Sequence, residues 1–402
     1  MSVRVVASSR APLATALLFL AACGPSPSPS SPSSPTRGAL APALPMPGPA
    51  PEPGFTGEAA VLRPDAVAQN QACERCHPSI AAEWRTSLHR DAHSDPAYRR
   101  ALAIEPLAFC RGCHAPEADP RAEPPAALGA MGVGCVTCHL VGDTVLAAPT
   151  SSPRGKAPHP VAREARFAGT GACAGCHEFA FPDRALRRQP ELMQSTVTEH
   201  DRSSAAGTAC AACHMPEAAG HRSHAFAGTR DEATMRAAVR VSAERSGPST
   251  VRLTLDPVGV GHALPTGDLF RRLEIHAEAE GSDHQVIADA RRYLTRHFRD
   301  ERTPKGDLLR SVAFDDRPLG GAMRLELGLD AAATTFPIAW RVTYQRVEHP
   351  RSEREDDSLV ESEVVLAQGV LAPLGSAVSA SPTRSSLNLR PTVVPLASPS
   401  QP

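Results

Sequence analysis

The sequence predicts two folded regions, the first built from short α-helices and loops and the second an all-β, sandwich-like domain. Three observations lead to this prediction. The pattern C-x-x-C-H occurs five times between residues 73 and 214 and contains ten of the chain's eleven cysteines. Beyond residue 213 cysteine no longer occurs, and short stretches of alternating apolar and polar residues appear instead. The break between the two regions falls near residue 229.

Each copy of the pattern has the spacing that attaches a c-type haem. Two thiols three residues apart form thioethers to the vinyl groups of one haem, and the adjacent imidazole becomes the proximal iron ligand. Structural zinc is the alternative, but zinc does not require a histidine after every second cysteine. The predicted attachment and proximal residues are Cys73, Cys76 and His77; Cys110, Cys113 and His114; Cys135, Cys138 and His139; Cys173, Cys176 and His177; and Cys210, Cys213 and His214.

The haem stoichiometry decides how the first region is built. Some 150 residues for five haems leave about 30 residues per cofactor, too few for a separate side-chain core. Aromatic residues make up only 4% of the chain, which suits a fold whose flat apolar surfaces come from porphyrin. We therefore expect a multihaem cytochrome c domain, with short α-helices and loops wrapped around five closely spaced haems.

The N-terminal end predicts export and lipid attachment. Arg4 and Arg10 precede an apolar run that is too short to span a bilayer, as in a secretory signal. The run ends in Leu20-Ala21-Ala22-Cys23-Gly24, which resembles the lipobox of bacterial lipoproteins, so Cys23 is the predicted lipidation site. An ordinary signal peptide with an incidental cysteine is the alternative. Gly24, in place of an aspartate, favours the outer membrane, with the protein facing the periplasm.

Composition then divides the chain into five parts. Residues 1–22 are the predicted lipoprotein signal peptide, and residues 23–56, rich in proline and serine, are a semi-rigid tether. Residues 57–228 are the predicted pentahaem domain, residues 229–374 the β-sandwich-like domain and residues 375–402 a disordered tail.

Four stretches in the second region have the period of two that marks half-buried strands. They are Val251/Leu253/Leu255, Leu273/Ile275/Ala277, Met323/Leu325/Leu327 and Ile338/Trp340/Val342/Tyr344. The polar stretch from Asp300 to Pro318 predicts a long loop. Because this half shows no nucleophile, paired carboxylate or phosphate-binding loop, we interpret it as a structural or docking module.

The histidine count allows a second axial ligand for every haem. Eleven of the sixteen histidines remain after the five proximal ones, and seven of them lie in or just after the haem region. They are His89, His93, His159, His200, His221, His224 and His262. A complete bis-histidine set is therefore possible with two to spare, which predicts low-potential haems. Methionine is the other common ligand, with Met193, Met215 and Met235 as candidates.

Local context ranks these histidines. His89 is expected on a helix that starts at Pro78, about 18 Å along the axis from His77, so it would serve a neighbouring haem. His93, one turn further on, is the alternative. His159 stands between two prolines, either as a rigidly presented ligand or as an exposed loop residue.

Four further histidines follow the fourth motif. His221 and His224, three residues apart, could serve two haems, or one could orient the other, with His224 preferred. His262 lies between two predicted strands, where it is either incidental in a hairpin turn or a ligand supplied by the second domain. His200, on a helical stretch from Thr196, is a weaker candidate.

Several of these segments resemble the multihaem cytochromes related to hydroxylamine oxidoreductase and its tetrahaem electron acceptor. The resemblance covers roughly residues 70–228. It rests on Trp84 to His89, Gly134-Cys135, Cys173 to Phe179, Cys213-His214-Met215-Pro216 and His221 to His224. The stretch from Gly261 to Gly267 looks like a loop of longer bacterial members that carry a β domain. The resemblance implies periplasmic electron transfer through mostly bis-histidine haems stacked in close pairs.

The leading hypothesis is an electron carrier that exchanges electrons with other cytochromes or with a quinol-oxidising complex. The alternative is an oxidoreductase that binds nitrite, hydroxylamine or a related small species at one open haem. Every motif here ends in histidine, unlike the C-x-x-C-K of pentahaem nitrite reductases, and Tyr98 matches no cross-linked tyrosine motif. The net charge of -1 disfavours a nucleic-acid partner.

Overall fold

The computed structural model describes residues 63–151, 157–180, 192–226, 228, 231–302, 304, 306, 308–348 and 355–375. The predicted signal peptide, Cys23 and the tether lie outside the described residues, as does all but the first residue of the predicted tail. The described residues belong to one compact unit. None of the helices in these ranges is long and apolar enough to cross a membrane.

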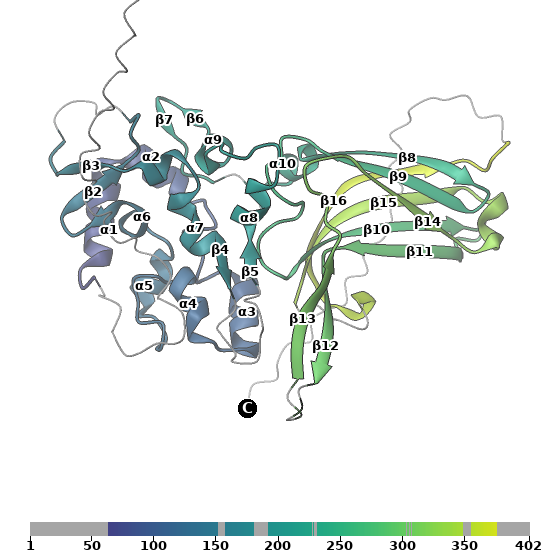
Figure 1. The fold of residues 1–402 in the computed structure, drawn as a ribbon, viewed down its shortest axis with the longest axis horizontal. Helices are drawn as coiled ribbons and strands as arrows, with labels where there is room; N and C mark the ends of the chain where they lie inside the picture. Colours follow the sequence, from purple (N-terminus) through teal and green to yellow (C-terminus); the bar gives the residue numbers. More distant parts are fainter. Residues whose placement is uncertain are drawn as a thin grey trace, which may run out of the picture. The chain divides into compact units, whose positions relative to one another are not determined.

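The haem region consists of short helices with one three-stranded and two two-stranded sheets between them (Figure 1). Its helices are α1 (Ala66–Cys76), α2 (Pro78–Trp84), α3 (Pro96–Ile104), α4 (Ala108–His114), α5 (Ala126–Met131), α6 (Cys135–His139), η1 (Ala165–Ala168), α7 (Gly171–His177), α8 (Thr196–Asp201) and α9 (Cys210–His214). Its strands are β1 (Leu140–Val141), β2 (Thr144–Ala147), β3 (Val161–Arg163), β4 (Glu178–Ala180), β5 (Leu192–Ser195), β6 (Glu217–Ala218) and β7 (His221–Arg222).

Each attachment motif forms the end of a helix. Helices α4, α6, α7 and α9 all end on the histidine of a motif, and α1 ends on Cys76, immediately before His77. Because residues three apart share a helix face, the two cysteines of each motif lie on the same side. The folding of the motifs as single helical turns therefore presents both thiols together.

The helix that starts at Pro78 is shorter than the sequence predicts. It ends at Trp84, so His89 lies in the turns that follow and not on a helix. Ser87 explains the end, because its hydroxyl donates to the Trp84 carbonyl at 2.7 Å and accepts from the Arg90 amide at 3.2 Å. A serine that bonds local backbone in this way competes with helix continuation.

The C-terminal region contains three antiparallel sheets that follow one short helix, α10 (Glu232–Ala237) (Figure 1). The first sheet has the order β11-β10-β15-β16, the second β14-β9-β8 and the third β12-β13. The strands are β8 (Val239–Gly247), β9 (Thr250–Pro257), β10 (Arg271–Glu280), β11 (Val286–Leu294), β12 (Arg296–Arg302), β13 (Leu308–Asp315), β14 (Met323–Gly328), β15 (Ile338–Val347) and β16 (Val360–Leu371), with η2 (Ala331–Thr335) and η3 (Glu355–Asp357) between strands.

The alternating residues of the four predicted strands form one core between the first two sheets. Val251, Leu253 and Leu255 of β9 are fully buried, as are Leu273 and Ile275 of β10. They belong to the same apolar cluster as residues of β14 and β15. The prediction of these four strands is confirmed, and the inward-facing residues come from both sheets.

The prediction of a loop from Asp300 to Pro318 is wrong. Most of this stretch belongs to β12 and β13, which pair antiparallel from Arg296 opposite Asp315 to Arg302 opposite Leu308. These two strands pair only with each other in the described part of the chain. Arg296 and Phe298 of β12 are buried, but five of the seven residues of this strand are charged, so its sequence lacks the apolar alternation that marks a strand.

The hairpin interpretation of the segment around His262 is also wrong. Strands β9 and β10 flank this segment but belong to different sheets. The residues between them therefore form a crossover from one sheet to the other. No tight turn brings β9 and β10 together.

Candidate haem-binding site

Cysteines of different attachment motifs lie next to one another. The Cys176 thiol is hydrogen-bonded to Cys113, and the Cys173 thiol to Cys210. Cys135 is close enough to Cys73 for their charges to interact, and Cys138 to Cys176 in the same way. These contacts place the fourth motif beside the second, third and fifth, and the first beside the third.

The described cysteines are all unpaired by disulfides, and burial keeps several of them neutral as free thiols. Burial raises the pKa of Cys138 to about 12. Burial and the charge of Cys73 raise the pKa of Cys135 to about 12 as well. Within the described ranges no group of three or more histidine, cysteine, aspartate or glutamate side chains has an arrangement able to hold a metal ion.

Two proximal histidines are oriented by the partner of their Nδ1 atom. His139 Nδ1 donates to the Leu146 carbonyl at 2.8 Å, and His114 Nδ1 to the Ala92 carbonyl at 2.5 Å. A donor bond from Nδ1 fixes the tautomer in which Nε2 has a free lone pair, as in metal-binding histidines generally.

Burial also keeps these imidazoles in the form that binds iron. It lowers the pKa of His114, His139 and His177, so each ring is neutral near pH 7. A protonated imidazole has no lone pair for a metal.

Three proximal histidines face a second imidazole at the spacing of a bis-histidine haem. A metal–imidazole bond is about 2 Å and the ring centre lies about 1 Å beyond the nitrogen, so opposite ligands have ring centres about 6 Å apart. The measured centroid distances are 6.2 Å for His177 and His89, 6.2 Å for His139 and His224, and 6.1 Å for His214 and His262. These residues fit three hexacoordinate haems.

His89 is held in place by the segment that leads into the third motif. The Val133 amide donates to the His89 carbonyl at 2.8 Å, and Trp84 Nε1 donates to the Val133 carbonyl at 2.9 Å. Gly132, at a φ of +58°, lies so close that a Cβ would come within 2.6 Å of the His89 carbonyl oxygen. Burial lowers the pKa of His89 to about 4, so its ring is neutral.

The structure separates His224 from His221. His224 Nδ1 donates to the Arg222 carbonyl at 2.8 Å, and its amide donates to Glu83 at 2.8 Å. The Nε2 of His221 instead contacts the Glu83 carboxylate at 3.0 Å. The Nε2 of His221, the atom that would bind iron, is therefore engaged by Glu83. The same carboxylate holds the backbone of His224 in place.

His93 has its Nε2 atom engaged in the same way. That atom is 3.0 Å from the Arg99 guanidinium and 3.4 Å from Glu123. Between the two alternatives in this segment, the geometry favours His89, whose ring faces His177, over His93.

His262 comes from the β region. Its Nδ1 donates to the Ala263 carbonyl at 2.9 Å, and its ring is within 12° of parallel to that of His214. Of the two interpretations of this histidine, the one in which the second region supplies a ligand matches the geometry.

For the first and second motifs the described residues show no imidazole opposite the proximal histidine. Tyr98 stacks on the His114 ring, with centroids 3.7 Å apart. Two candidates have no ring partner in the described part: His159, whose Nδ1 is 3.4 Å from the Pro160 carbonyl, and His200, which is buried and whose Nδ1 has no hydrogen bond. Among the methionines, Met235 is in the β core, whereas Met193 and Met215 are half-buried in the haem region.

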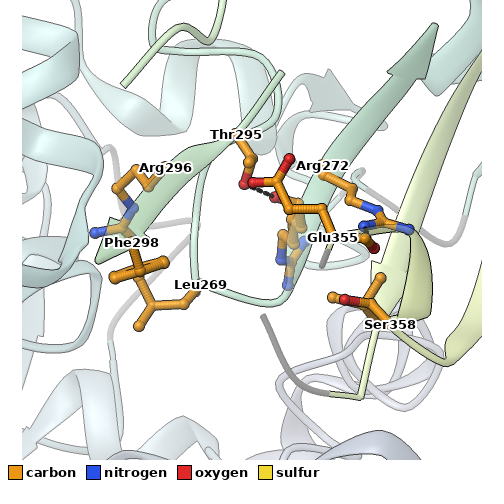
Figure 2. Close-up of a pocket in the computed structure, with 9 residues that line it drawn as sticks. Leu269, Arg272, Thr295, Arg296, Phe298, Glu355 and Ser358 are labelled. Carbon is orange, nitrogen blue, oxygen red and sulfur yellow. Dashed lines mark hydrogen bonds between the residues drawn. The ribbon is translucent and has the colours of Figure 1, made fainter. Parts of the chain in front are cut away.

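The small pocket in the β region is too small to hold a haem. It is lined by Leu269, Arg271, Arg272, Thr295, Arg296, Phe298, Val347, Glu355 and Ser358 and has a volume of about 10 Å³ (Figure 2). Thr295 donates to the Arg271 carbonyl at 3.2 Å, and Arg272 to the Glu355 carbonyl at 2.7 Å. This space accommodates no more than about one water molecule, so the candidate site remains the cluster of attachment motifs.

Comparison with known proteins gives two results. The family described as cytochrome c554 and c-prime matches residues 72–140, which contain the first three attachment motifs. A penta-heme cytochrome c552 from Thermochromatium tepidum has a similar structure, with a TM-score of 0.55 and 18% sequence identity over 75% of this chain and 97% of that chain. No curated protein matches the sequence. Together with the motifs, these likenesses support a multihaem c-type cytochrome with covalently bound haem and a β-rich C-terminal region.

Proposed function

We propose that the protein is a pentahaem c-type cytochrome that transfers electrons between redox partners. The observation that carries this proposal is the adjacency of cysteines from all five motifs, with the fourth motif next to three others. Haems supply reversible one-electron exchange, which is fast when they are closely spaced. The chain contributes the attachment points and their order.

The imidazole pairs favour low reduction potentials. His89, His224 and His262 complete three bis-histidine sites, and His159 and His200 are the remaining candidates for the first and second. The Nδ1 atoms of His139, His224 and His262 donate to backbone carbonyls, which makes these rings stronger donors that stabilise the oxidised iron. In this proposal His93 and His221 are the two histidines not used as ligands.

We place the protein at the bacterial cell envelope. Cys23 carries a lipid anchor, the Pro/Ser-rich tether separates it from the folded part, and the folded part faces the periplasm from the outer membrane. The partners are other periplasmic or membrane cytochromes or a quinol-oxidising complex, without nucleic acid. The two sheets with a shared core support a sandwich-like β domain.

One observation favours a second candidate function. In the described part of the chain no imidazole lies opposite His114, whose ring is covered by Tyr98. An iron held there with one position open would bind nitrite, hydroxylamine or a related species, and the protein would be an oxidoreductase related to hydroxylamine oxidoreductase.

Electron paramagnetic resonance of the oxidised protein distinguishes the two functions. The carrier predicts only low-spin signals that nitrite and hydroxylamine do not alter, together with reduction of all five haems in a potentiometric titration. A stoichiometric high-spin signal that shifts when nitrite is added would overturn the carrier and support the enzyme.

A further inference from the structure

One segment of the haem region is hydrogen-bonded to the crossover loop between β9 and β10. This segment runs from Thr196, at the start of α8, to Thr208, two residues before the fifth attachment motif. It contacts the loop on both sides of His262. The same short stretch of chain therefore leads into Cys210 and holds the loop that faces His214.

Glu199 of α8 is the centre of these contacts. Its Oε2 accepts from the Ala263 amide at 3.2 Å and from the Thr266 hydroxyl at 2.6 Å. Its Oε1 accepts from the Ser195 hydroxyl at 2.7 Å and from Arg317 at 2.7 Å. Glu199 is only 6% exposed, so four donors converge on a charge that is almost removed from water.

Arg317 connects the same loop to the β region. Its Nη1 donates to the Pro265 carbonyl at 2.8 Å, and its Nε and Nη2 form a two-pronged ion pair with Asp315 at 2.9 and 2.7 Å. The Leu264 amide donates to the Pro318 carbonyl at 3.0 Å, next in sequence to Arg317. The three residues that follow His262 are thus each fixed by a hydrogen bond of their backbone.

Gly261, the residue before His262, is held by a hydrogen bond and by close packing. Ser203 donates to the Gly261 carbonyl at 3.0 Å. A Cβ on Gly261 would lie 2.7 Å from the Ala205 side chain, which only glycine avoids. The backbone on either side of His262 is therefore immobilised, and this sets the direction of its side chain.

We infer that Glu199 and Arg317 are positioning residues that hold His262 opposite His214, so that the β region controls the coordination of the fifth haem. The inference rests on the proposed function and deepens it. It also accounts for a buried ion pair whose formation costs desolvation: such pairs contribute conformational specificity more readily than stability. Here the specific feature is the ring-to-ring spacing of 6.1 Å.

The test compares four variants of the full, haem-loaded chain by electron paramagnetic resonance and potentiometric titration. His262→Ala identifies the signal of the fifth haem, which becomes high-spin. Glu199→Gln removes the charge but leaves Arg317 paired with Asp315, so the fold survives. Thr266→Val removes one hydrogen bond to Glu199, and Thr266→Ser restores it. We expect Glu199→Gln, and to a smaller extent Thr266→Val, to convert part of that same signal to high-spin and to shift its midpoint potential, with Thr266→Ser as wild type.

Glu326→Gln is the matched control. It makes the same chemical change in an exposed ion pair with Arg252, far from the loop in sequence, and is expected to leave all signals unchanged. Haem content is measured first, because a chain without haem at Cys210 and Cys213 would overturn the proposed function and this inference together. If five haems are present, a Glu199→Gln protein with wild-type spectra, or with a change in a haem other than the one altered by His262→Ala, overturns the inference alone.

Discussion

The two regions of this molecule differ in what fills their interiors. In the β region the described residues include one apolar cluster of 21 buried side chains. In the haem region the corresponding cluster has only four, Ala66, Trp84, Met131 and Val136. The difference indicates that one region folds around its own side chains and the other around its cofactors.

The largest expected effect follows from withholding haem. In full-length protein produced without haem-attachment machinery, the haem region has too small a core to fold, whereas the β region keeps its own. Limited proteolysis with mass spectrometry should recover a resistant fragment that begins near residue 231, while the haem-loaded protein resists over both regions. Equal protection of both regions in the haem-free protein would contradict the comparison.

A core substitution should act on the β region alone. Ile275→Ala on β10 removes a fully buried side chain, and the cavity should lower the free energy of unfolding by about 2–5 kcal/mol. Ile287→Ala on β11, where the side chain is 37% exposed, is the matched control and should cost much less. Urea denaturation followed by circular dichroism measures both. Nearly equal losses would mean that the two-sheet core is not packed as described.

A backbone substitution should act on the haem region. Gly132→Ala places a methyl group against the His89 carbonyl and forces alanine into a left-handed conformation. Gly142 has a similar φ, +56°, with no atom near its absent Cβ, so Gly142→Ala should cost about 1 kcal/mol through conformation alone. We expect only Gly132→Ala to convert the haem held by His177 to high-spin, as read by electron paramagnetic resonance. The same spectrum in both variants would disprove the role of Gly132 in placing His89.

The smallest expected effect is a pH dependence of the free energy of unfolding, confined to the β region. His297 lies between Asp316, 2.9 Å from Nε2, and Glu355, 2.6 Å from Nδ1, and stacks on Phe314. Burial opposes protonation, but the hydrogen bonds to the two carboxylates outweigh it and raise the His297 pKa to about 9. Because the folded pKa is raised, the stabilisation is complete below about pH 6.5 and is lost as the pH rises through about 9.

We expect this loss to be about 1 kcal/mol, given the partial exposure of the pair. Urea midpoints at pH 6 and pH 10 measure it, and His297→Gln should flatten the difference without changing the haem spectra. A profile that stays as steep in His297→Gln would assign the pH dependence to another group.

The sequence predicts the parts of this structure that depend on local patterns. The attachment motifs and the four alternating strands are such patterns, and so is the helical stretch that carries His200, which α8 confirms. The sequence does not show that α2 ends at Trp84, because the competing bonds of Ser87 depend on the fold of the turn. It does not show the pairing of β12 with β13 either, since β12 consists mostly of charged residues and lacks apolar alternation.

The choice among distal histidines could not be made from spacing for a similar reason. His221 and His224 differ only in which of their atoms meets Glu83, a residue 138 positions away from His221. His93 and His89 differ in whether Arg99 or His177 faces the ring. Long-range contacts decide these roles. One further sequence signal was available in the glycines at 132 and 261. A Cβ would clash with the His89 carbonyl at Gly132 and with the Ala205 side chain at Gly261, next to His262.

Intact-mass spectrometry of the protein purified from its native host, combined with haem quantification, tests the central claim most directly. The claim is that each of the five C-x-x-C-H motifs holds one haem through its two cysteines. The account predicts a mass increase of five haems on a single chain, with every motif cysteine resistant to thiol alkylation. A colourless protein with ten alkylatable motif cysteines, or one that binds zinc at these positions, would contradict it.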